Sequence, residues 1–277
     1  MDIKLIAIDL DGTLLNSRKC MSDNNREALI SCIRKGIHIV PCTGRTVDGI
    51  PAEIKDIPGI RYAITTNGAV IEDMKENIVI DTRMLTCDLA LELLRFVDPY
   101  RVMYDPYIER RGITESRFID HLAEFALTPE LQDLVRNTRD VCPDIIEYVE
   151  KANKPVEKIN LFFSDMEERA KLRAELEKRN DILVTSSIPN NLEINALDAT
   201  KGDAIIRLSS HLGISPSQTM GIGDGENDFT MILKAGVGVA MKNGSKELIE
   251  AADYVTETND EDGVASAIRN LVLEMGI

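Results

Sequence analysis

Leu5-Ile6-Ala7-Ile8-Asp9-Leu10-Asp11-Gly12-Thr13-Leu14 is the stretch that decides the fold of this 277-residue chain. Its first four residues are apolar, as expected for a short strand of a parallel sheet with both faces buried. Polar side chains begin directly after them, with Asp9 and Asp11 two positions apart and Gly12 suited to a sharp turn. The stretch therefore predicts a buried strand that ends in two carboxylates.

Strands and helices alternate in the sequence that follows. A helix over about 23–35 leads into a strand over 37–40, and Thr43-Gly44 comes just after that strand. This order predicts a doubly wound α/β fold with a parallel sheet, in which ligands bind beyond the carboxyl ends of the strands. Asp9 and Thr43 are therefore expected on the same rim of the sheet.

The last third of the chain has the same pattern. An apolar run over 220–222 is followed directly by Gly223-Asp224-Gly225-Glu226-Asn227-Asp228, so a second acidic cluster comes after a second buried strand. The other elements expected in the two ends of the chain are strands over 61–65, 69–71 and 237–240 and helices over 201–211, 229–235 and 263–275.

The middle of the chain predicts a separate domain. We expect helices over 88–97, 115–125 and 167–179 and strands over 101–104, 145–149, 158–163 and 182–185, with Tyr104–Tyr107 at a hairpin tip. This is an inserted α+β cap domain over 83–188, within a Rossmann-like core domain made of 1–82 and 189–277.

Composition excludes some classes of protein. The net charge of −15 would repel a nucleic-acid backbone, so no nucleic-acid partner is expected. The five cysteines are scattered, with no Cys-x-x-Cys pair, which favours reduced thiols in the cytoplasm. No apolar segment is long enough to span a membrane. We therefore expect no membrane association, and no obligate protein partner is evident.

The acidic residues predict a metal site. Asp9 and Asp11 would repel each other without a cation between them, and carboxylate oxygens suit Mg²⁺. An isolated Asp-x-Asp is more often a solvated turn, but this pair follows a buried strand. Asp224 and Asp228, which alone are equally typical of an acidic loop, would complete such a site.

Two further features suit a bound phosphate group. Thr43-Gly44 offers a hydroxyl and a backbone N–H, although most Thr-Gly pairs are ordinary turns. Lys201 stands at an expected helix start and could supply positive charge, although a single lysine near a helix N-terminus is usually a surface residue. Neither feature is specific alone.

These four stretches, in this order, resemble the four motifs of the haloacid dehalogenase-like phosphatases. The resemblance is strongest to the Cof-type subfamily, which carries a large α/β cap between its second and third motifs, and it covers the whole chain. Asn67-Gly68-Ala69 and Asn191–Ile194 also resemble that subfamily. The resemblance implies a Mg²⁺-dependent phosphatase of small phosphorylated metabolites, with sugar phosphates as the expected class.

The resemblance also implies roles for individual residues. Asp9 resembles the nucleophile that becomes an aspartyl-phosphate, and it is also a metal ligand. Asp11 resembles the acid and base for the leaving alcohol and water, while its backbone carbonyl binds the metal. Asp224 would complete the metal shell, and Asp228 would support it or orient Lys201. The expected phosphate-binding groups are the backbone of Leu10 and Gly44 and the side chains of Thr43, Lys201 and Asn227.

Two other functions remain open at this point. A phosphotransferase or phosphomutase acting on sugar phosphates would share the nucleophile and the metal. A non-catalytic regulator that binds phosphorylated metabolites would be expected to lack Asp9 or Asp11, and both are present.

Overall fold

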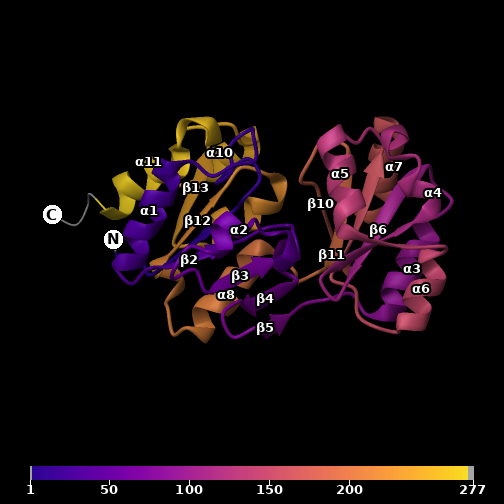
Figure 1. Cartoon of the computed structure of the whole chain (residues 1–277), viewed down its shortest axis with the longest axis horizontal. Coiled ribbons are helices and arrows are strands. Elements are labelled where there is room, and N and C mark those ends of the chain that lie inside the picture. The colour runs from indigo at the N-terminus through magenta and orange to yellow at the C-terminus, as the bar shows by residue number, and fades with distance from the viewer. Residues whose placement is uncertain (1, 274–277) are drawn as a thin grey trace. The chain divides into compact units, whose positions relative to one another are not determined.

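The computed structural model describes residues 2–273, which form two compact units (Figure 1). The first unit contains the chain up to Thr82 and from Thr200 onward, and the second contains Arg83–Ala199. No helix within residues 2–273 is both long enough and apolar enough to cross a membrane.

The inserted unit ends at Ala199, eleven residues beyond the predicted boundary at residue 188. The reason is strand β11 (Asn191–Ala196), which pairs with β9 (Lys158–Phe163) and β10 (Ile182–Thr185) of the second unit. Its hydrogen bonds therefore hold it in the inserted unit.

The first unit is built on a five-stranded sheet in the order β14-β13-β12-β1-β2, and every neighbouring pair is parallel. Strand β1 lies between β12 and β2, so residues far apart in sequence follow neighbouring strands. The expected fold class, a doubly wound core with an inserted α+β unit, is confirmed. The strands are β1 (Leu5–Ile8), β2 (His38–Pro41), β12 (Thr219–Gly223), β13 (Val237–Met241) and β14 (Tyr254–Thr256).

Both faces of this sheet are covered, which explains the apolar sequence of β1. Ile6 and Ile8 belong to one hydrophobic cluster, which includes residues of α1 and α11, two helices that pack together (Figure 1). Leu5 and Ala7 point the other way, into a cluster with residues of α8 and α9. The helices of this unit are α1 (Asp23–Arg34), α2 (Ala52–Lys55), α8 (Lys201–His211), α9 (Phe229–Lys234), α10 (Lys246–Ala251) and α11 (Gly263–Ile268).

The last helix is shorter than expected. Helix α11 ends at Ile268 and continues as a π-helical turn over Arg269–Leu273. The remainder of the expected helix, residues 274 and 275, lies outside the described residues.

A small antiparallel sheet follows β2. It consists of β3 (Tyr62–Thr65), β4 (Val70–Asp73) and β5 (Ile78–Thr82), of which β5 was not predicted. A single parallel bridge between Cys42 and Ile64 joins it to the end of β2. The turn between β3 and β4 is thereby held beside the rim of the main sheet.

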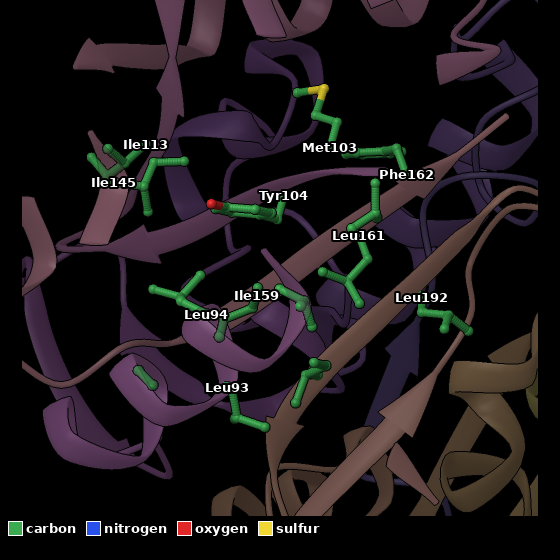
Figure 2. Close-up of a cluster of buried hydrophobic side chains, with 14 of the residues drawn as sticks. Leu93, Leu94, Met103, Tyr104, Ile113, Ile145, Ile159, Leu161, Phe162 and Leu192 are labelled. Atoms are coloured by element: carbon green, nitrogen blue, oxygen red, sulfur yellow. The ribbon is translucent and has the colours of Figure 1, made fainter. Parts of the chain in front are cut away.

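The second unit contains a six-stranded sheet in the order β10-β11-β9-β6-β7-β8. Figure 2 shows part of its core, in which Leu94 of α3 lies with Tyr104 of β6 and Ile159 of β9. The strands are β6 (Val102–Ile108), β7 (Arg111–Glu115), β8 (Arg139–Cys142), β9 (Lys158–Phe163), β10 (Ile182–Thr185) and β11. The helices are α3 (Cys87–Val97), α4 (Ser116–Ile119), α5 (Pro129–Thr138), α6 (Ile145–Ala152) and α7 (Met166–Leu176).

Three expectations for this unit are wrong. The segment 145–149 is not a strand but the start of α6, because Asp144 caps a helix there by accepting a hydrogen bond from the N–H of Glu147. Tyr104–Tyr107 is not a hairpin tip, since it lies buried within β6 and the turn comes at 109–110. The helix expected over 115–125 is broken between α4 and a 3₁₀ turn at Leu122–Phe125.

Candidate active site

The carboxyl ends of the central strands carry the site. Asp9 follows β1, Thr43 comes two residues after β2, and Asp224 follows β12. Because β12, β1 and β2 are parallel neighbours, these three residues lie on one rim of the sheet.

Lys201 lies between two carboxylates at this rim. Its Nζ is 2.6 Å from Oδ1 of Asp9 and 2.6 Å from Oδ1 of Asp228. The side chain is completely buried. It extends from the first turn of α8, which begins where the hydroxyl of Thr200 accepts a hydrogen bond from the N–H of Asp203. A lysine in this position is a structural part of the site and not a surface cation.

Asp228 uses both carboxylate oxygens within the protein. Oδ1 pairs with Lys201, and Oδ2 accepts hydrogen bonds from the backbone N–H groups of Asp224 (3.0 Å) and Gly225 (2.9 Å). Asp228 therefore fixes the loop after β12 and the lysine at once.

The carboxylates of Asp9, Asp224 and Asp228 fit a divalent cation. One oxygen from each lies within 4.8 Å of the others, and oxygen donors of this kind suit Mg²⁺. One lysine cannot balance three carboxylates, so the cluster has excess negative charge that a cation would offset. The side chain of Asp11 does not belong to this group.

The ionisation of the cluster reflects the same excess charge. Burial raises the pKa of Asp9 well above its usual range; Lys201 opposes this shift, and Asp228 and Asp224 add to it. Burial and then repulsion from Asp228 raise the pKa of Asp224 to about 7. Burial by itself would lower the pKa of Lys201, but Asp228 and Asp9 raise it, so the lysine remains protonated.

The loop after β1 packs tightly against Asp224. The hydroxyl of Thr13 donates a 2.6 Å hydrogen bond to Oδ1 of Asp224. Gly12 has a φ of +87°, and a Cβ at this position would lie 2.4 Å from Oδ2 of Asp224. Both the backbone conformation and the close approach therefore require glycine here.

The carboxylate of Asp11 pairs with two cations. Arg45 donates from Nε to Oδ2 (2.7 Å) and from Nη2 to Oδ1 (2.8 Å), while Lys19 donates to Oδ1 (2.8 Å). Burial alone would raise the pKa of Asp11, but Arg45 and Lys19 lower it to about 2. Neither cation was among the predicted site residues, although Arg45 directly follows Thr43-Gly44.

The remaining predicted residues lie in the loops around this rim. Thr43 is buried, and its Oγ1 accepts a hydrogen bond from the N–H of Arg45. Gly44 lies between them in the same loop. Leu10 is buried after β1, and its carbonyl accepts a 2.9 Å hydrogen bond from the N–H of Leu15.

Asn227 is held by a residue to which the sequence analysis assigned no part in the site. Its Nδ2 donates to Oδ1 of Asn67 at 3.1 Å. Asn67 and Thr66 both have positive φ values, +62° and +47°, in the turn between β3 and β4. This strained turn is tied to the loop after β2 by hydrogen bonds from the N–H of Asn67 to the carbonyl of Thr43 and from the N–H of Thr66 to that of Arg45. The feature of the sequence that could have pointed to this residue is the Asn67-Gly68 pair, which is typical of a turn.

A doubly wound core, an inserted α+β unit and a rim of aspartates around a buried lysine define an α/β enzyme that handles phosphate esters. The profile of the haloacid dehalogenase-like hydrolases matches residues 6–268, and the chain belongs to this family.

Several of the relatives of this chain are named phosphatases. The chain is 33% identical over 273 residues to 5-amino-6-(5-phospho-D-ribitylamino)uracil phosphatase YcsE of Bacillus subtilis, covering 99% of this chain and 97% of that protein. It is 32% identical to phosphatase YwpJ of the same organism, over 98% of this chain and all of that protein. The chain is accordingly an enzyme of the phosphatase class.

Solved structures agree with this assignment. A haloacid dehalogenase-like hydrolase from B. subtilis has a TM-score of 0.86 at 30% identity, covering 98% of this chain and 100% of that one. The sugar phosphatase BT4131 of subclass IIB has a TM-score of 0.80 at 25% identity, over 96% and 98% of the two chains.

Proposed function

We propose that this chain is a Mg²⁺-dependent phosphatase of small phosphorylated metabolites, with sugar phosphates as the substrate class and Asp9 as the nucleophile. The observation that carries the proposal is the position of Lys201, buried and 2.6 Å from both Asp9 and Asp228. A fixed positive charge beside a nucleophilic carboxylate is what attack on an anionic phosphoryl group requires.

The reaction has two steps. A carboxylate oxygen of Asp9 attacks phosphorus, the ester P–O bond breaks, and Asp11 gives a proton to the departing alcohol. Water then attacks the aspartyl-phosphate and loses a proton to Asp11, which releases phosphate and restores Asp9. In the present conformation the ion pair with Arg45 holds the carboxylate of Asp11 in its ionised form. Asp11 must therefore separate from Arg45 before it can carry a proton to the departing alcohol.

The other residues have supporting parts. The Thr43 hydroxyl, the backbone N–H groups of Leu10 and Gly44, and the Asn227 amide bind the oxygens of the phosphoryl group. Asp228 orients Lys201 and the loop after β12, because both of its oxygens are already in use.

The metal would be held by Asp9, Asp224 and the backbone carbonyl of Asp11. When bound, Mg²⁺ offsets the negative charge shared by the phosphoryl group and the aspartates. The clustering of Asp9 and Asp224 oxygens and the raised pKa of both groups support this part of the proposal.

The names of relatives support the substrate class and the small size of the substrate. One is named a phosphatase of a phosphorylated ribityl compound, and another is described as a sugar phosphatase. The five cysteines are all free, which supports a reducing compartment such as the cytoplasm.

A panel of sugar phosphates and other phosphorylated metabolites tests this function. We expect phosphate release with MgCl₂, loss of that release with a chelator, and none from Asp9→Asn. Isomerised sugar phosphate without free phosphate would instead identify a phosphomutase. No turnover of any kind, with the fold and metal binding intact, would make the chain a binding protein.

A further inference from the structure

Two asparagines from the C-terminal part of the chain contact the loop that follows β1. Nδ2 of Asn243 donates a 2.8 Å hydrogen bond to the carbonyl of Gly12. Nδ2 of Asn259 donates a 3.0 Å hydrogen bond to the carbonyl of Leu15. The two asparagines are also joined to each other, because Oδ1 of Asn243 accepts a 2.9 Å hydrogen bond from the N–H of Asn259. We call Asn243 and Asn259 the asparagine pair.

The loop that the asparagine pair contacts carries two groups on which the site depends. Asp11 lies directly before Gly12 in the chain, and Thr13 lies directly after it. The hydroxyl of Thr13 donates a hydrogen bond to the carboxylate of Asp224. Because a peptide group is planar, fixing the carbonyl of Gly12 also fixes the plane that leads into Thr13. The hydrogen bond from Asn243 therefore acts on the backbone between these two groups.

Packing holds the far end of this loop more firmly than its beginning. Leu15 is completely buried in a hydrophobic cluster of the first unit. Gly12 has no side chain to pack, and its φ of +87° lies in a region that favours glycine. The hydrogen bond from the N–H of Thr13 to the carbonyl of Leu10 is long, at 3.4 Å. The shorter hydrogen bond from Asn243 therefore helps to orient the peptide group after Gly12.

The loop that carries Asn243 is itself fixed against Asp224. It follows β13, the parallel neighbour of β12, so the loops after both strands lie on one rim of the sheet. The N–H of Ser245 donates a 3.1 Å hydrogen bond to the carbonyl of Asp224. A Cβ at Gly244 would lie 3.1 Å from the same carbonyl oxygen, so the two loops are in close contact. Asn243 thus connects the loop after β1 to the loop that carries a proposed metal ligand.

Solvation alone does not explain these contacts. Asn243 is exposed, and a carbonyl near the surface can accept a hydrogen bond from water at little cost. A hydrogen bond from the protein adds a fixed position, which water does not provide. The next part of the loop is held in the same way, because Asp260 accepts hydrogen bonds from the N–H (2.8 Å) and the hydroxyl (2.6 Å) of Ser17.

We propose that Asn243 and Asn259 are positioning residues, which hold the loop after β1 so that the carboxyl group of Asp11 reaches the oxygen of the departing alcohol. This inference rests on the proposed function, in which Asp11 supplies the proton. The side chain of Asp11 must separate from Arg45 to do so, and a fixed backbone limits where it can then move. Proton transfer requires hydrogen-bond distance, so a displacement of about 1 Å is enough to slow the reaction.

Two esters distinguish a displaced Asp11 from a general loss of structure. The alcohol of a sugar phosphate needs a proton as it leaves, whereas p-nitrophenolate is stable without one. The value of kcat/KM covers binding of the ester and transfer of its phosphoryl group to Asp9, and it does not include the later reaction with water. A displaced Asp11 therefore lowers kcat/KM for the sugar phosphate more than for p-nitrophenyl phosphate, and a damaged site lowers both.

The experiment compares Asn243→Ala and Asn259→Ala with the wild type, all as full-length protein. We would measure kcat/KM with p-nitrophenyl phosphate and with the best sugar phosphate of the panel above. Hydrogen–deuterium exchange of the peptide that contains residues 10–15 reports the order of the loop without any turnover. Asn270→Ala is the matched control, because its side chain donates a 3.0 Å hydrogen bond to the hydroxyl of Tyr254 in the same unit and not to the loop.

We expect each variant of the asparagine pair to lower kcat/KM by about 10-fold for the sugar phosphate and by no more than about 2-fold for p-nitrophenyl phosphate. Exchange in residues 10–15 should be faster in both variants. Asn270→Ala should change neither quantity. All three variants should lower the melting temperature by a similar, small amount, because each loses hydrogen bonds near the surface.

Equal losses with the two esters, or no loss with either, would overturn the proposal. Unchanged exchange in residues 10–15 would also overturn it, because the asparagine pair would then not hold the loop. If the wild type itself releases no phosphate from either ester, it is the proposed function that fails, and with it the role of Asp11. The exchange measurement would still decide separately whether the asparagine pair holds the loop.

Discussion

Lys201 is the residue on which the electrostatics of the site depend most. It is the cation closest to both Asp9 and Asp228, and none of its side chain reaches solvent. Charge interactions in such a buried place are much stronger than at the surface. Removing this cation therefore affects both the chemistry and the fold.

We predict that Lys201→Met lowers kcat/KM by about 100- to 1,000-fold. It should also lower the melting temperature, because Asp9 and Asp228 would remain buried without their partner. Lys201→Arg keeps the charge and the fold but not the position of the ammonium group, so it should lose activity with a smaller loss of stability. The exposed Lys4→Met is the control and should change neither quantity; near-normal activity of Lys201→Met would contradict the assignment.

Gly12 offers a second test at this scale. Gly12→Ala places a Cβ against Asp224 and adds strain at a positive φ, so it should abolish most activity. Gly213→Ala is the matched control: its φ is +70°, but nothing lies within 4 Å of the added Cβ. Both variants should lose about 1 kcal/mol of stability from the backbone, and only Gly12→Ala should lose phosphate release. Equal activity of the two variants would show that the contact with Asp224 is unimportant.

The residues of the rim were easier to predict than their contacts. A strand that ends in Asp9 and another that ends at Asp224 could be predicted, because short apolar runs followed by polar clusters have few alternatives in an α/β chain. The pairing of Asp11 with Arg45 could not, because it depends on side-chain conformations in two loops. For the same reason the Asn67-Gly68 turn could be located in the sequence, but the hydrogen bond from Asn227 to Asn67 could not be predicted.

At the scale of elements, prediction succeeded for the central strands of the first unit, missed β5, β14 and α10 there, and failed in parts of the second unit. The central parallel strands β1, β12 and β13 are buried throughout, so their apolar runs are unambiguous. The run Ile145–Val149 is largely apolar, with Glu147 at its centre, but it forms a helix, because a short run of this kind fits either structure and the cap at Asp144 decides. Tyr104–Tyr107 contains Asp105 and a proline, which is typical of a turn, yet the ion pair with Arg139 allows it to lie buried within β6.

The hairpin of β3 and β4 allows a pH prediction. Asp73, at the end of β4, accepts hydrogen bonds from the side chain of Arg61 (2.8 Å) and the N–H groups of Lys75 and Glu76. These hydrogen bonds lower the pKa of Asp73, and the bond from Arg61 has the largest effect. A carboxyl group whose pKa is lower in the folded than in the unfolded protein stabilises the fold at pH values above its unfolded-state pKa of about 3.9. This stabilisation is lost as the pH falls through the folded-state pKa.

Asp73→Asn should therefore lower the melting temperature at pH 7, and the difference from the wild type should shrink as the pH falls below about 4. Thermal unfolding at a series of pH values measures this. Asp133→Asn removes an exposed carboxylate of a loose ion pair and should change little at any pH. A difference at Asp73 that does not depend on pH would exclude this ionisation as its cause.

At the scale of the whole molecule, excess negative charge links metal binding to stability. The chain carries a net charge of −15, and three of its carboxylates meet at one rim. A ligand that binds only the folded state stabilises it, by about 2.7 kcal/mol at 100 times its Kd. The rim is therefore expected to make the melting temperature depend on divalent cations.

We predict that MgCl₂ raises the melting temperature and that a chelator reverses the effect. Asp224→Asn should raise the melting temperature of the metal-free protein, because it removes repulsion from a buried cluster, but it should reduce the gain from MgCl₂. The exposed Asp120→Asn is the control and should keep the full gain. A melting temperature that does not respond to divalent cations would argue against a metal at this rim.

The most direct test of the central claim is to look for the phosphoryl group on the protein. The enzyme is mixed with an excess of a sugar phosphate that it hydrolyses, stopped with acid during turnover, digested and analysed by mass spectrometry. We predict one added phosphoryl group on the peptide that contains Asp9, and none in Asp9→Asn. Rapid turnover with no phosphorylated protein, or with the phosphoryl group on another residue, would contradict the account.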